Sequence, residues 1–109
     1  MTLAVPEPVA AYLAAEAAKD ANAISRCFAQ DSAVRDEGRE YRGRDAIRQW
    51  KTTADAKYNY VLVPLGVRAE GNLVTVRARI TGDFPGSPVE LDHIFTLSND
   101  EIASLQIRS

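Results

Sequence analysis

The stretch that decides the fold covers residues 73–84 and reads LVTVRARITGDF. Its apolar residues fall at every second position: Val74, Val76, Ala78 and Ile80. The positions between them hold Thr75, Arg77, Arg79 and Thr81. Successive side chains of a strand point to opposite faces, so this segment predicts a strand with one face on the core and the other face outward.

Similar segments lie on both sides of it. We expect strands over residues 57–68, 89–97 and 102–107, because apolar and polar residues alternate there as well. The intervening segments 70–72, 85–88 and 98–101 are short and rich in Gly, Pro, Asn and Ser, which favour turns. Long strands joined by short turns predict an antiparallel meander.

The first half of the chain is typical of helices. An alanine-rich helix is expected to begin near Pro6 and Pro8. A second helix, capped by Asp20 or Asn22, is expected to end near residues 30–32. Its apolar residues are Ile24, Cys27 and Phe28. A third covers residues 44–56 with apolar residues three to four apart. Between the last two, residues 33–36 and 39–42 flank Glu37-Gly38, which suggests a small hairpin. Residues 1–109 are therefore expected to form a single α+β domain with helices packed on one face of its sheet.

Composition excludes several classes of protein. The 109 residues carry a net charge of −2, without the basic excess typical of nucleic-acid binders. One Cys and one His allow neither an internal disulfide nor a Cys-based zinc site, so we expect no metal. No segment resembles a signal peptide or a membrane span, which predicts a cytoplasmic protein that does not bind membranes.

No stock catalytic motif is present, but the whole chain resembles the NTF2-like superfamily. The residues that resemble its opening are Tyr12, Asp20, Ile24, Phe28-Ala29, Asp31, Val34 and Asp36. Gly43-Arg44-Asp45-Ala46-Ile47 with Trp50 resembles its third helix, and residues 91–97 followed by Ile102 resemble its last two strands. Within the superfamily the chain is similar to SnoaL-like and ketosteroid-isomerase-like proteins. The resemblance implies a strongly curved sheet, mostly antiparallel, wrapped around three N-terminal helices as a cone with a pocket inside.

The resemblance to the steroid isomerases also implies roles for single residues. Tyr12 matches a tyrosine that donates a hydrogen bond to a substrate oxygen, and Asp36 matches the general base. Asp92 resembles a protonated aspartic acid that completes an oxyanion hole, whereas SnoaL-like proteins often have a histidine at the position of His93. Together such groups support proton transfer beside a carbonyl.

Three features depart from that pattern. Glu37-Gly38 follows Asp36 where the family has proline in a longer loop, and Lys51 replaces a supporting tyrosine. In addition, Asp92 and His93 are neighbours on a strand and must face opposite ways unless a bulge intervenes. Strand parity favours His93 in the pocket and the motif favours Asp92, so both remain candidates.

Two functions are therefore considered. The first is an isomerase, cyclase or dehydratase that needs no cofactor and acts by acid–base chemistry on a hydrophobic carbonyl- or hydroxyl-bearing molecule, with Phe28, Trp50 and Tyr58 in the cavity wall. The second is a non-catalytic module for ligand binding or dimerisation, in which Asp36 only caps the hairpin or pairs with a nearby arginine. In both cases the resemblance implies a homodimer formed by the outer face of the sheet, with Arg77 or Arg79 at the interface.

Overall fold

The computed structural model describes residues 5–109 and contains three helices and six strands over that range. The helices are α1 (Glu7–Ala17), α2 (Ala21–Arg26) and α3 (Arg44–Tyr58). The strands are β1 (Phe28–Asp36), β2 (Arg39–Arg42), β3 (Val61–Glu70), β4 (Leu73–Thr81), β5 (Val89–Ser98) and β6 (Glu101–Arg108). They form one sheet in the order β2-β1-β6-β5-β4-β3, in which β1 and β6 are parallel and all other neighbours are antiparallel.

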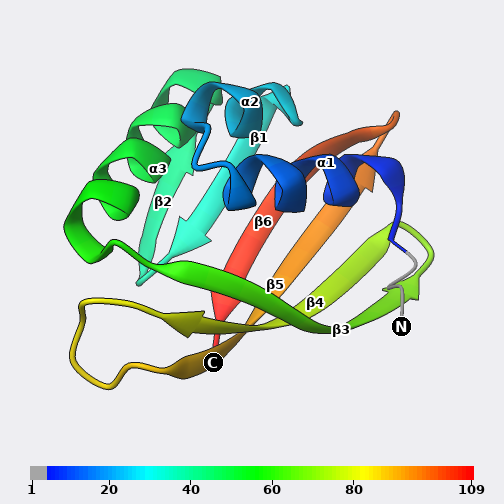
Figure 1. Ribbon diagram of the computed structural model, residues 1–109. Coiled ribbons are helices and arrows are strands. Elements are labelled where there is room, and N and C mark those ends of the chain that lie inside the picture. The colour runs from blue at the N-terminus through cyan, green and yellow to red at the C-terminus, as the bar shows by residue number, and fades with distance from the viewer. Residues whose placement is uncertain (1–4) are drawn as a thin grey trace.

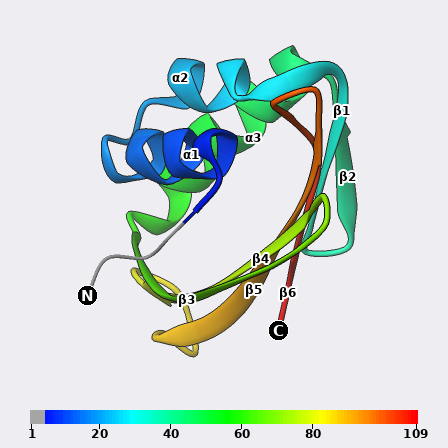
Figure 2. The ribbon, with the colours of Figure 1, turned by 90° about the vertical axis from the view of Figure 1, so that its right-hand side faces the viewer.

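The sheet is strongly curved, and all three helices lie on its concave side (Figures 1 and 2). It does not close into a barrel, since β2 and β3 remain free edges. The predicted α+β architecture, with three helices inside a curved and mostly antiparallel sheet, is confirmed. Among residues 5–109, no helix has both the length and the apolar character needed to cross a membrane.

The main difference from the sequence prediction lies at the second helix. It was expected to continue to about residue 30, but α2 ends at Arg26 and Phe28 already begins the nine-residue strand β1. The Oδ1 atom of Asp20 caps α2 by accepting a hydrogen bond from the amide of Ala23 at 3.0 Å. The strand is stabilised by parallel pairing with β6, where Phe28 lies opposite Ile102. Local periodicity carries no information about a partner so distant in sequence.

The hairpin predicted at Glu37-Gly38 is present and joins β1 to β2. Both turn residues have positive φ angles, 54° and 76°, as in the two-residue turns whose twist matches that of paired strands. Asp36 and Arg39 are the last pair before the turn. The turn therefore fixes the position of Asp36 at the very end of β1.

The core forms where the helices meet the concave face. The parity predicted for β4 is confirmed, since Val74, Val76, Ala78 and Ile80 are all buried. Burial of a valine or isoleucine side chain stabilises the fold by about 1.5–3 kcal/mol, and burial of the smaller Ala78 by less. Residues of the other parity on β4 lie on the convex face, which the helices leave uncovered.

Candidate active site

Helices and sheet enclose a cavity of about 690 Å³, a volume in the range of small-molecule sites. Its wall is mainly apolar and aromatic, with a few polar side chains. The lining residues include Tyr12, Asp36, Trp50, Lys51, Ala54, Tyr58, Tyr60, Phe84, Leu91, His93 and Ile107.

Tyr12 reaches the cavity from α1 and is fully buried. Its ring packs edge-on against Phe28 and Phe95, at centroid distances of 6.1 and 5.1 Å. Its hydroxyl has no hydrogen-bond partner within residues 5–109. Burial raises the pKa of Tyr12 well above the usual value, and nearby Glu16 adds to this, so the phenol stays neutral. A neutral phenol without a partner is free to donate a hydrogen bond to a ligand.

Asp36 lies at the end of β1 and also lines the cavity. Its Oδ2 atom accepts a hydrogen bond of 3.0 Å from the indole N–H of Trp50, which fixes the carboxylate against α3. Burial raises the pKa of Asp36, although the bond from Trp50 opposes this effect. Desolvation of a carboxylate makes it a stronger base than a carboxylate in water.

The alternative in which Asp36 is neutralised by a nearby arginine does not match the contacts. Arg35 and Arg42 both pair with Glu40, at 3.5 and 2.8 Å, on the exposed side of the hairpin. Within residues 5–109 no ion pair involves the carboxylate of Asp36.

Of Asp92 and His93, the structure places His93 in the cavity. His93 lies opposite Val76 across the β4–β5 ladder, is only 3% exposed, and its Nδ1 atom has no hydrogen-bond partner within residues 5–109. Asp92 lies on the convex face, where its Oδ1 is 3.2 Å from Nη1 of Arg77. Burial lowers the pKa of His93 to about 4, so the imidazole is neutral at pH 7.

The three residues expected in the cavity wall are not all found there. Trp50 and Tyr58 line the cavity, and the ring of Tyr58 packs edge-on against Phe84 at 5.9 Å. Phe28 instead lies in the core, fully buried, where it contacts Tyr12. The cavity therefore brings together Tyr12, Asp36 and His93, whereas Asp92 and Phe28 lie outside it.

A buried ion pair beside the cavity was not predicted from the sequence. Lys51 on α3 is 1% exposed and Glu16 on α1 is 2% exposed, with 2.5 Å between Nζ and Oε2. Lys51 also donates a hydrogen bond to the hydroxyl of Tyr60. The signal was present in the pattern: Glu16 lies one helical turn after Tyr12, and Lys51 one turn after Ile47, so both charges interrupt buried faces. Among residues 5–109, no three His, Cys, Asp or Glu side chains are placed to hold a metal ion.

The fold is shared with known structures. The chain is similar to the crystal structure of a protein from Sinorhizobium meliloti for which a polyketide cyclase function has been suggested, with 39% identity over 95% of both chains and a TM-score of 0.93. It is also similar to a protein of ketosteroid isomerase-like fold from Catenulispora acidiphila in complex with trimethylamine, with 28% identity, a TM-score of 0.85, and 97% of this chain and 87% of that chain covered. A protein from Sphaerobacter thermophilus shares the fold at 24% identity and a TM-score of 0.81, over 98% and 96% of the two chains.

Among curated proteins no match is found. Residues 9–105 match the SnoaL-like domain, which covers most of the chain and confirms the resemblance. The chain therefore belongs to the SnoaL-like family of the NTF2-like superfamily.

Proposed function

We propose that the protein is an acid–base enzyme of the isomerase, cyclase or dehydratase type, acting on a neutral, hydrophobic small molecule with a carbonyl or hydroxyl group. One observation carries this proposal: the wall of a largely apolar cavity holds a carboxylate and two neutral polar groups that have no partner within residues 5–109, the hydroxyl of Tyr12 and Nδ1 of His93. Unpartnered polar groups in a cavity of ligand size are typical of sites whose partner is a ligand.

The proposed chemistry assigns each group a separate part. Asp36 removes a proton from the carbon beside the carbonyl, and Trp50 holds one carboxylate oxygen so that the other is free to react. Tyr12 donates to the carbonyl oxygen, where negative charge develops. His93 is the third polar group, because its neutral imidazole offers a further hydrogen bond. General base catalysis of this kind contributes about 10²–10⁴-fold in rate.

The relatives are consistent with this chemistry. A polyketide cyclase function has been suggested for the protein from Sinorhizobium meliloti, which is 39% identical to this chain. The protein from Catenulispora acidiphila holds a small molecule, trimethylamine. These likenesses support an acid–base site in a small-molecule cavity.

The test is deuterium exchange beside the carbonyl of 2-tetralone, followed by NMR, together with isomerisation of a β,γ-unsaturated 3-oxo steroid, followed by absorbance of the conjugated product. Asp36→Asn should reduce the exchange rate by about 10²-fold or more without changing the circular dichroism spectrum. Asp92→Asn is the matched control, since this carboxylate lies on the convex face, and it should leave exchange unchanged. Equal exchange in Asp36→Asn and wild type would reject Asp36 as the base. Binding of 2-tetralone without exchange would favour the non-catalytic alternative.

We further propose a homodimer formed by the convex face of the sheet. Val61 and Val63 on β3 are 60% and 47% exposed, and Val63 lies opposite Arg79 across the β3–β4 ladder. Arg79 and Arg77 both pair with Glu90, at 3.5 Å each. An apolar strip beside mixed charges suits a two-fold interface, where the same surface meets itself. The apolar strip on β3 was not anticipated from the sequence.

Light scattering at micromolar concentration should give twice the monomer mass of 11.9 kDa for the wild type. Val63→Glu should shift the mass towards that of the monomer, because it places a charge inside the apolar strip. A wild-type mass near 11.9 kDa would contradict the dimer.

A further inference from the structure

Four charged side chains meet at one wall of the cavity, and one of them, Lys51, lines it. The Nζ atom of Lys51 lies 2.5 Å from Glu16 and 3.6 Å from Asp55, and Nζ of Lys19 lies 3.5 Å from Glu16 and 3.9 Å from Asp55. Two positive and two negative charges balance formally. Removing such ions from water costs several kcal/mol each, so a buried ion pair is a poor device for stability alone. A role at the cavity wall is the better explanation.

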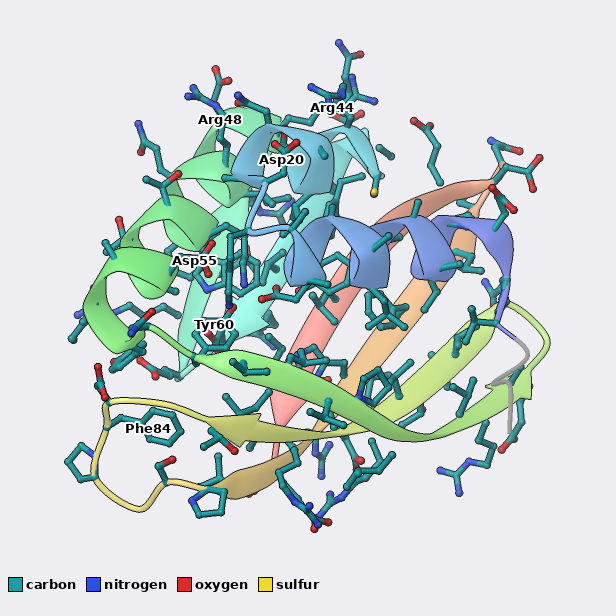
Figure 3. The ribbon with its side chains drawn as sticks, in the orientation of Figure 1. Asp20, Arg44, Arg48, Asp55, Tyr60 and Phe84 are labelled. Atoms are coloured by element: carbon teal, nitrogen blue, oxygen red, sulfur yellow. The ribbon has the colours of Figure 1, made fainter. Side chains whose placement is uncertain are left out.

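Tyr60 contacts this cluster and also lines the cavity, and Figure 3 labels it together with Asp55 of the cluster. Lys51 donates a hydrogen bond to its hydroxyl oxygen, and Lys19 donates one to its backbone carbonyl. The two ammonium groups also lie 3.8 Å (Lys19) and 4.6 Å (Lys51) from the centroid of its ring. Within residues 5–109, no acceptor takes the hydroxyl hydrogen of Tyr60.

These contacts make the Tyr60 hydroxyl a strong hydrogen-bond donor. An O–H group whose oxygen accepts a hydrogen bond is polarised and donates more strongly in turn. The effect is larger when the group that donates to it is an ammonium ion. Lys51 has three N–H bonds, and its neighbours Glu16, Tyr60 and Asp55 surround the ammonium. Lys51 itself lines the cavity, and its hydrogen bond to Tyr60 gives it a second, indirect effect there.

We propose that Tyr60 is a second hydroxyl donor of the site, which binds an oxygen of the ligand, and that Lys51 is the positioning residue that holds and polarises it. The ligand class that fits this donor carries an oxygen with concentrated negative charge, such as a carbonyl, an enol or a phenol. The proposal rests on the proposed function, since it requires a small molecule in the cavity. It adds a donor from the start of β3 to the one that α1 supplies in Tyr12.

The test compares two probes that differ by one hydroxyl group, 2-naphthol and naphthalene, by isothermal titration calorimetry. Tyr60→Phe should weaken binding of 2-naphthol about tenfold and change binding of naphthalene less than twofold, because only the hydroxyl is lost. Tyr41→Phe is the matched control. Tyr41 packs against Trp50 at a centroid distance of 6.1 Å and is not among the residues that line this cavity, so neither affinity should change.

The part of Lys51 is tested by removing both charges of the buried pair. The double variant Glu16→Gln/Lys51→Met leaves no unpaired ion, and it should weaken 2-naphthol several-fold with little effect on naphthalene. In protein labelled with ¹³C at the tyrosine Cζ atoms, the resonance of Tyr60 should move in this variant and should move in the wild type on addition of 2-naphthol. A purely structural ion pair would change the affinities of both probes equally and would leave that response to 2-naphthol absent.

Each remaining outcome overturns the proposal. If Tyr12→Phe weakens 2-naphthol and Tyr60→Phe does not, then Tyr12 is the only phenol donor and the proposed function stands without Tyr60. If the wild type binds neither probe, the small-molecule site itself fails and this inference falls with it. If Tyr60→Phe does not fold, the Tyr60 resonance decides, and an unchanged resonance on addition of 2-naphthol rejects the contact.

Discussion

The stability of the protein should depend on pH through its single histidine. His93 is buried against an apolar surface, and burial lowers its pKa from 6.5 to about 4. Charged groups from each neighbouring element act on it more weakly: Glu16 on α1 and Asp92 on β5 raise the pKa, and Lys51 on α3 lowers it. Between pH 6.5 and 4 the unfolded chain therefore binds a proton at this site that the folded chain does not.

The sign and size follow from that difference. The free energy of unfolding is unaffected by His93 above pH 6.5 and falls as the pH drops from 6.5 towards 4. Each pKa unit corresponds to about 1.4 kcal/mol, so the shift amounts to about 3 kcal/mol, of which roughly 2.4 kcal/mol lies between pH 7 and pH 4.5. For a domain of this size, that is a substantial part of the total stability.

Urea unfolding of the wild type and of His93→Gln, followed by the fluorescence of Trp50, measures this effect. Carboxylates titrate in the same range, so the informative quantity is the difference between the two proteins at each pH. That difference should change by about 2–3 kcal/mol between pH 7 and 4.5, with the wild type losing more. A constant difference, or an NMR titration of the imidazole in the folded protein near pH 6.5, would show that burial does not hold His93 neutral.

Two further predictions concern stability. Lys51→Met should reduce the free energy of unfolding in urea by about 3 kcal/mol, because it leaves the buried Glu16 with only the partly exposed Lys19 as a counter-ion, at 3.5 Å. Combining it with Glu16→Gln should recover most of the loss, and equal values for the single and double variants would contradict this. Gly82→Ala should reduce the free energy of unfolding by about 1–3 kcal/mol, because a Cβ at this position would lie 2.8 Å from the backbone oxygen of Tyr58. Thermal unfolding of Gly66→Ala is its control, since a Cβ at Gly66 meets no atom within 4 Å, and similar losses in both would reject the steric argument.

Where the alternation of side chains along a strand sets the position of a site residue, the sequence indicated that position. His93 shares the parity of Leu91 and Phe95, and this alone points it to the concave face. The family motif pointed to Asp92, so the sequence left both residues open, and the register that places His93 opposite the buried Val76 decides between them. The hairpin turn was likewise predicted, from Gly38 between two short strand-like runs, whereas the positive φ of Glu37 could not be predicted from its residue type.

The parts that depend on contacts between distant segments could not be predicted. The length of β1 follows from its pairing with β6, about 70 residues later, and local spacing is equally consistent with a helix at Phe28. Glu16 and Lys51 each interrupt the buried face of a helix, but only the packing of α1 near α3 shows that the two charges meet. The same packing decides that Phe28 belongs to the core and Tyr60 to the cavity.

The unclosed sheet has a consequence for the behaviour of the protein at high concentration. Its two free edges, β2 and β3, present unpaired backbone groups that could template the growth of fibrils. The edge strand β2 is short and has an arginine at each end, Arg39 and Arg42, whose positive charges repel the same strand of another molecule. The edge strand β3 is long and exposes valines, but Pro64 lacks an N–H and a bulge follows before Gly66. Only residues 61–63 of β3 precede this interruption, which is fewer than the roughly six residues that a cross-β segment needs. We therefore expect the sheet to keep its free edges without nucleating aggregation.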